Sequence, residues 1–342
     1  MSDKLVRAAI LLLAASLFVA QSSEAQIRER IRDIVPGARR PAPPGQPAEG
    51  PGGSDYTHAT VAEMSFGEEE NQCWIFEPAQ PKPASAPVIV FLHGWGAQSP
   101  LPYRSWVDHI VRHGNIVIYP RYQVLRTRGP DFNPNAILAV KSALRALQTP
   151  GHVKPDTNRF AIVGHSAGAV GAANMAAVAA AQGLPKPGAL MIVQPGRGPD
   201  PDNPDPKFGI PLEDLSPVPA DALALVLVGD ADKIAGNAVA KDIFAKLGHI
   251  PAKNRDYIIV RSDGHADPPL VADHFSPCAG PGKGVDALDW YGYWKLFDAL
   301  TDAAFYDGKN RHIALGNTPP QRYMGEWTDE RMVFELVVTD TP

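Results

Sequence analysis

The sequence has few of the features that define several large classes of protein. Its 342 residues include only two cysteines, so a disulfide-rich scaffold is excluded. Lysine and arginine number 32 against 37 aspartates and glutamates, which gives a net charge of −5 and no basic surface for a nucleic acid. Neither a Gly-Lys-Ser/Thr phosphate loop nor a Gly-x-Gly-x-x-Gly dinucleotide motif is present. We therefore expect no nucleic-acid partner and no cofactor.

The N-terminus has the pattern of a secretory signal peptide. Lys4 and Arg7 precede an apolar run over residues 8–20, which the small-x-small sequence Ser23-Glu24-Ala25 follows. This run is shorter than the roughly 20 residues that span a bilayer, and no later apolar run is long enough. We predict a signal peptide over residues 1–25, a secreted or periplasmic protein, and no stable membrane insertion. Export would permit a disulfide between Cys73 and Cys278, which the sequence leaves open.

The rest of the chain divides into a spacer and one domain. Residues 26–55 are rich in proline, glycine and arginine, a composition typical of a disordered linker. Six short apolar runs, ending at residue 260, alternate with segments of helical periodicity and begin at Val88. This alternation predicts an α/β domain over residues 56–342, with a mostly parallel central sheet, helices on both faces and a C-terminal extension. The proline-rich stretch 195–219 is expected to frame a cleft at the carboxyl edge of the sheet.

The candidate nucleophile is Ser166. The apolar run 160–163 leads into Gly164-His165-Ser166-Ala167-Gly168, and an alanine-rich segment follows at once. Strand, sharp turn and helix are the context that a Gly-x-Ser-x-Gly nucleophile requires, because small flanking residues let the chain double back and expose the hydroxyl.

A serine nucleophile requires a base and a carboxylate that orients it. His265, on a loop after the sixth apolar run, is the favoured base, and His274 is the alternative. Asp232, after the fifth run, is favoured as the carboxylate over Asp230, which is also suited to capping the turn.

The oxyanion of an acyl-transfer intermediate needs two backbone donors. The amides of Ala167 and of Trp95, in the loop His93-Gly94-Trp95-Gly96, are the candidates. Further candidate contacts to a substrate are the side chains of His93, His165, Tyr119 and Tyr122.

A metal site is not expected. His109 and His113 have the i, i+4 spacing of ligands on a helix, but no third ligand is evident in the sequence.

Ser166, Asp232 and His265 in this order, with the His-Gly-Trp loop upstream, resemble the α/β-hydrolase superfamily over about residues 87–304. Within it the chain is similar to secreted esterases of the dienelactone-hydrolase and polyester-hydrolase kind. The resemblance implies an eight-stranded, mostly parallel sheet and a two-step acyl-enzyme mechanism on small or polymeric esters. It leaves two alternatives open: a serine peptidase of the prolyl-oligopeptidase type, and a binding protein that has lost catalysis.

Overall fold

The computed structural model describes residues 41–198, 209–279 and 284–342. The predicted signal peptide, and residues 26–40 of the predicted linker, lie outside these residues. In the described chain a single nine-stranded sheet has the order β1-β2-β4-β3-β5-β6-β7-β8-β9. The strands are β1 (Val61–Phe66), β2 (Cys73–Pro78), β3 (Ser85–Leu92), β4 (Ile116–Pro120), β5 (Lys154–His165), β6 (Pro187–Val193), β7 (Leu223–Gly229), β8 (Arg255–Val260) and β9 (Val337–Thr339).

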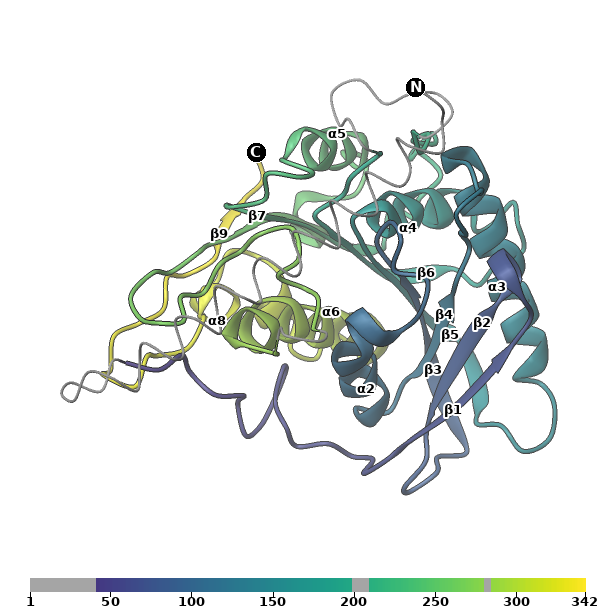
Figure 1. Cartoon of the computed structure of the whole chain (residues 1–342), viewed down its shortest axis with the longest axis horizontal. Helices are drawn as coiled ribbons and strands as arrows, with labels where there is room; N and C mark the ends of the chain where they lie inside the picture. The colour runs from purple at the N-terminus through teal and green to yellow at the C-terminus, as the bar shows by residue number, and fades with distance from the viewer. Residues whose placement is uncertain (1–40, 199–208, 280–283) are drawn as a thin grey trace.

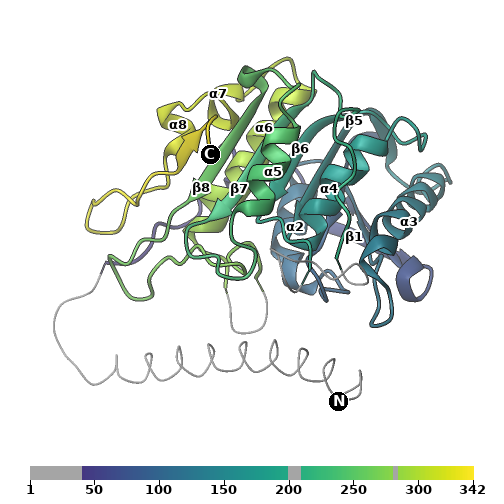
Figure 2. The ribbon, with the colours of Figure 1, turned by 90° about the horizontal axis from the view of Figure 1, so that it is seen from above.

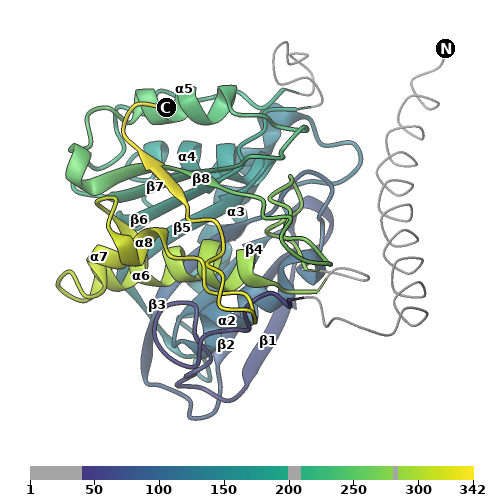
Figure 3. The same ribbon diagram turned by 90° about the vertical axis from the view of Figure 1, so that its left-hand side faces the viewer.

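Strands β3 to β8 pair in parallel, and the six apolar runs of the sequence form them, as predicted. Antiparallel strands β1 and β2 extend one edge. At the other edge β9, from the C-terminal extension, pairs antiparallel with β8 (Figure 3). The ninth strand is an addition to the eight that the resemblance implies.

Helices cover both faces of the sheet, as Figure 1 shows. Their bounds are α2 (Arg104–Arg112), α3 (Phe132–Ala146), α4 (Ala167–Val178), α5 (Ala238–Lys246), α6 (Lys295–Phe305), α7 (Arg311–Ala314) and α8 (Pro319–Arg322), with a π-helical turn, η5 (Leu288–Trp294), before α6. Helices α3, α4 and α5 pack on one face and α2 and α6 on the other, so two apolar cores enclose strands that are buried on both sides. Among the described residues no helix is both long and apolar enough to cross a bilayer.

The prediction of a disordered linker needs correction at its C-terminal part. Residues 41–55 have no regular secondary structure, but they lie against the domain. The amide of Gly52 donates to Asp298 on α6 at 2.8 Å, and the amide of Ala42 donates to the Thr328 hydroxyl at 2.8 Å. Composition did not reveal this because contacts to residues distant in sequence hold the segment in place: these hydrogen bonds, and the burial of Pro44 beside Gly325.

The C-terminal extension, the chain beyond Phe305, packs beside β8, where Figure 2 shows it in yellow. Trp327 is buried, and its indole donates to Asp263 in the loop after β8 at 3.1 Å. The same carboxylate accepts the amide of Phe334 at 3.1 Å. The extension therefore holds the loop that carries His265. Cys73 and Cys278 are both thiols, and no disulfide joins them.

Candidate active site

The turn between β5 and α4 has the backbone strain expected of a nucleophile elbow. Ser166 has φ 56° and ψ −121°, a conformation that residues with side chains rarely adopt. A Cβ on Gly164 would lie 2.1 Å from the Gly168 carbonyl oxygen, and one on Gly168 would lie 2.1 Å from that of Leu92. Only glycine fits at either position, and this close packing of elbow, helix and β3 fixes the half-buried hydroxyl at the carboxyl edge of the sheet.

His274, and not His265, is the histidine beside the nucleophile. His274 Nε2 lies 2.9 Å from Ser166 Oγ, and its Nδ1 lies 2.8 Å from Asp232 Oδ2. His265 instead contacts the C-terminal extension, with Nε2 2.8 Å from Asp329 Oδ2 and Nδ1 2.6 Å from Arg331. The prediction of His265 as the base is therefore wrong, and the alternative, His274, takes the position.

A backbone bridge explains why the nearer histidine is displaced. Asp263 and Leu270 pair as an isolated antiparallel bridge, so residues 264–269 form an excursion that returns the chain to its starting point. The chain then passes the end of β7, where the Ala272 carbonyl accepts the amide of Ala231 at 3.2 Å. His274 therefore lies beside the end of β7, although it comes 14 residues after Val260, the last residue of β8.

The two aspartates after β7 make different contacts: Asp232 lies beside His274, and Asp230 lies in the loop after β8. Asp230 accepts the amide of Ser262 at 2.9 Å and caps the loop after β8. Asp232 is buried and accepts the amides of Ile234 and Ala235, each at 2.9 Å, as well as His274 Nδ1. Burial opposes its ionisation, but the hydrogen bond and charge of His274, together with these amides, hold the pKa of Asp232 below its ordinary value.

Two backbone amides beside Ser166 are available to an oxyanion. Gly94 passes so near that a Cβ on it would lie 3.3 Å from Ser166 Cβ. Its amide donates to the Tyr103 hydroxyl at 3.0 Å, and that of Gly96 donates to Gln123 Oε1 at 2.9 Å. Between these anchors the Trp95 amide donates to no other described residue, and neither does that of Ala167 at the start of α4. Both predicted donors thus remain open.

The four predicted substrate contacts are buried side chains that support the site from behind. His93 stacks on Tyr122 with ring centroids 4.3 Å apart, and the Tyr122 hydroxyl donates to the His93 carbonyl. Tyr119 Oη lies 2.9 Å from the Ser99 carbonyl oxygen and positions the loop after β3. Because His93, Tyr119, Tyr122 and His165 are nearly inaccessible, the prediction that they touch substrate is wrong.

Two buried residues, His165 and Gln194, hold the loop of His274, and no sequence pattern indicates this role. His165 Nε2 lies 2.8 Å from the His274 carbonyl oxygen, and Gln194 Nε2 donates to the Asp273 carbonyl at 2.8 Å. His165 Nδ1 lies 2.7 Å from the hydroxyl of Tyr103. The carbonyls that these side chains bind carry no sequence information, so only the fold shows the contacts.

Gly196, where the proline-rich stretch begins, also lies beside the nucleophile. Its amide donates to the Ser166 carbonyl at 3.2 Å, and a Cβ on it would lie 3.7 Å from Ser166 Oγ. This end of the stretch does border the site. Residues 199–208, within the same predicted loop, lie outside the described chain.

Comparisons with known proteins agree with this architecture. One of two fungal esterases from Rhizomucor miehei, whose structural analysis concerned their substrate specificity, superposes with a TM-score of 0.52. The match covers 74% of this chain and 87% of that chain at 14% sequence identity. The chain has the α/β-hydrolase fold. The predicted resemblance to α/β-hydrolases is confirmed.

The part of the hydrolase fold that carries the elbow also matches a family model. The chlorophyllase model matches residues 55–207, from the first strands through Ser166 to the proline-rich stretch. No curated protein matches the sequence. Asp232 and His274 lie beyond the matched range, so their place in the hydrolase site rests on the geometry of this chain.

Proposed function

We propose that the protein is a serine hydrolase of carboxylic esters. The observation that carries the proposal is the continuous hydrogen-bonded chain from Ser166 Oγ through His274 to Asp232, at 2.9 and 2.8 Å. An imidazole so placed accepts the serine proton, and the ionised Asp232 stabilises the imidazolium that results. The chlorophyllase family model and the fungal esterase fold support ester hydrolysis as the reaction class.

The reaction proceeds in two steps. Ser166 Oγ forms a bond to the ester carbonyl carbon while its proton passes to His274 Nε2, and the amides of Trp95 and Ala167 stabilise the oxyanion. The ester C–O bond then breaks, and the imidazolium returns the proton to the departing alcohol. Water, deprotonated by the same nitrogen, then attacks the acyl carbon. The bond from that carbon to Ser166 Oγ breaks, the imidazolium returns the proton to Oγ, and the acid is released.

A substrate panel and a labelling experiment test this function. We expect wild type to hydrolyse short p-nitrophenyl esters, and a fluorophosphonate to add to Ser166 as seen by peptide mass spectrometry. Chlorophyll belongs in the panel because of the name of the matching family, and peptide p-nitroanilides separate an esterase from a peptidase. An unlabelled Ser166 in folded protein would favour the binding protein, and efficient cleavage of the anilides would favour the peptidase.

We also infer that the protein is exported. The basic, apolar and small-residue order of residues 1–25 supports this. Expression of the full chain, followed by N-terminal sequencing of protein from the periplasm or medium, is expected to find a mature chain that begins near Gln26. Protein retained in the cytoplasm with an intact N-terminus would contradict it.

A further inference from the structure

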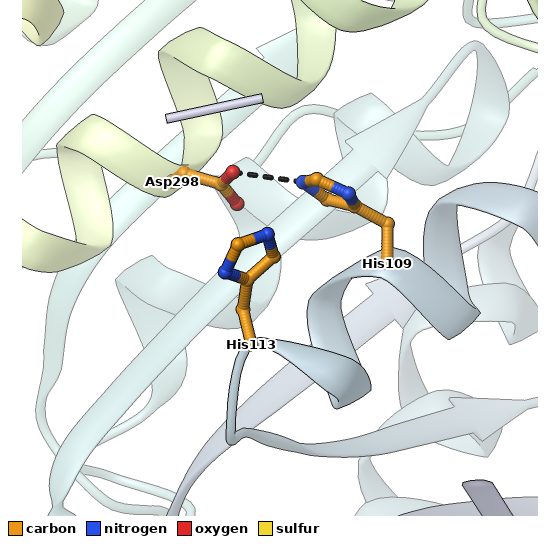
Figure 4. Close-up of side chains that lie close together, drawn as sticks. All are labelled: His109, His113 and Asp298. Atoms are coloured by element: carbon orange, nitrogen blue, oxygen red, sulfur yellow. Dashed lines mark hydrogen bonds and ion pairs between the residues drawn. The ribbon is translucent and has the colours of Figure 1, made fainter. Parts of the chain in front are cut away.

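A second group of potential ligands lies away from Ser166, between helices α2 and α6. His109 and His113 come from α2 and its C-cap, and Asp298 comes from α6. One ligand atom from each lies within 4.8 Å of the other two. Figure 4 shows both imidazoles and the carboxylate directed toward one another. The third ligand that the sequence did not reveal is therefore present, because the fold brings a helix almost 190 residues later against α2.

From this geometry we propose that His109, His113 and Asp298 bind a divalent transition-metal ion of the Zn²⁺ class. Two imidazoles and one carboxylate are a donor set that zinc accepts, with metal–ligand distances of about 2.0–2.2 Å. A tetrahedral ion at such distances requires donor atoms roughly 3.4 Å apart. Side-chain rotations that move the donor atoms by about 1 Å bring the three ligands to this spacing.

The surroundings of the ligands suit a metal centre. The second ring nitrogen of His109, Nδ1, lies 3.1 Å from the hydroxyl of Tyr56, the kind of partner that orients a ligating imidazole. Tyr56 is itself held by Gln46 Nε2 at 3.0 Å and by the guanidinium of Arg112, 3.7 Å from its ring centre. Asp298 Oδ2 accepts the Gly52 amide, which orients the carboxylate.

An ion and a fourth ligand can reach the site from solvent. His113 and Asp298 line a cavity of about 310 Å³, which Asp55 and Asp302 also line. Lys309 lines the same cavity and pairs with Asp302 at 3.1 Å, so it is Asp55, together with Asp298, that gives the approach the negative charge that attracts a cation. His109 is buried behind them.

The site has a structural role rather than a catalytic one. Helix α2 starts in the loop after β3, at the edge that carries Ser166, and ends just before β4 begins, at the opposite edge. Gly52 and Gly53, which hydrogen-bond with Asp298 and His113, belong to the ordered N-terminal segment 41–55, and Tyr56, beside His109, directly follows it. A bound ion therefore fastens this segment to α2 and α6.

Metal binding is measured on the folded protein after treatment with EDTA and removal of the chelator. We expect one equivalent of Zn²⁺ by isothermal titration calorimetry, a higher Tm in the presence of Zn²⁺, and tetrahedral visible absorption bands when Co²⁺ is added. H113A and D298N should each weaken Zn²⁺ binding at least tenfold. Y56F should weaken it about tenfold through the orientation of His109.

The matched control is H312A, because His312 is an exposed histidine outside the cluster. It should retain full binding and the full rise in Tm. Circular dichroism confirms that each variant is folded before titration. Absence of binding at micromolar Zn²⁺, or binding that survives in both folded H113A and folded D298N, overturns the proposal and leaves the cluster as a hydrogen-bonded clamp. Esterase activity plays no part in this readout, so the two proposals fail separately.

Discussion

His165 and His274 are joined by a hydrogen bond of 2.8 Å from a ring nitrogen of the first to the backbone carbonyl of the second. A carbonyl oxygen only accepts, so His165 Nε2 carries the proton and Nδ1 is the acceptor. The Tyr103 hydroxyl accepts the amide of Gly94 and therefore donates to this Nδ1. One chain of hydrogen bonds thus runs from the oxyanion loop, behind the nucleophile, to the residue proposed as the base.

From this series of hydrogen bonds we predict that Tyr103 is a positioning residue. Y103F removes one hydroxyl that serves both Gly94 and His165, and an unpaired buried group costs about 1–3 kcal/mol of stability. We expect kcat to fall about tenfold or more with KM nearly unchanged, because the oxyanion amide and the base both lose alignment. The check is steady-state kinetics on a p-nitrophenyl ester below the Tm of the variant. Equal loss in F91L, which removes packing beside Tyr103 but no hydrogen bond, would show that the effect is general destabilisation.

The two candidate histidines are separated by a matched pair of variants. H274A should lower kcat/KM at least a thousandfold, as loss of a triad base does, while S166A gives a similar loss. H265A removes contacts to Asp329, Arg331 and the ring of Trp327, none of which touches Ser166, and should retain activity within a few-fold. Activity is measured on the same ester, with Tm as the control for folding. An inactive but stable H265A would reverse the assignment.

We predict that the residue at position 196 limits the size of the acyl group that the site accepts. The Cβ position of Gly196 has ordinary contact distances of 3.5 Å to Ala235 and 3.7 Å to Ser166 Oγ, so G196A should be tolerated. G196L extends a side chain beside the hydroxyl and should reduce kcat/KM roughly tenfold or more for long acyl esters, and less for acetate. Parallel measurements on p-nitrophenyl acetate and octanoate test this. A uniform loss on both esters would argue against a steric effect.

Two buried histidines predict that acid destabilises the fold. Burial, with the nearby charge of His274, lowers the pKa of His165 from 6.5 to about 3. Burial likewise lowers the pKa of His93 from 6.5 to about 4, although carbonyl hydrogen bonds oppose this. At a pH between 6.5 and the lowered pKa of each histidine, that histidine is protonated in the unfolded chain but neutral in the folded chain. The free energy of unfolding should therefore fall with decreasing pH below 6.5, by up to about 1.4 kcal/mol per pH unit for each histidine.

Urea unfolding at pH 7, 6 and 5 measures this slope. H165Q keeps a donor toward the His274 carbonyl but has no titrating ring, so its slope between pH 6 and 5 should be shallower than that of wild type. H312Q, at an exposed position, should leave the slope unchanged. Identical slopes in wild type and H165Q would contradict the prediction.

Local patterns predicted the parts of this protein that depend on neighbouring residues. The apolar runs became the parallel strands, and the glycines around Ser166 produced the strained turn, because strand burial and backbone sterics act within a few residues. His274 was ranked second to His265 because its position depends on a bridge between Asp263 and Leu270 and on contacts from the C-terminal extension. The ordered N-terminal segment was missed for the same reason, since its partner, Asp298, is more than 240 residues away.

Because Asp263 and Leu270 form a bridge, the number of residues between β8 and His274 does not determine the distance between them in space. Chain inserted at the tip of the excursion, around Gly264, would enlarge the loop while its closed base kept His274 where it is. The number of residues between β8 and His274 can therefore change without moving the imidazole. Searches that require a fixed interval between them would overlook relatives that carry such an insertion, whereas searches that compare the spatial position of the imidazole would retain them.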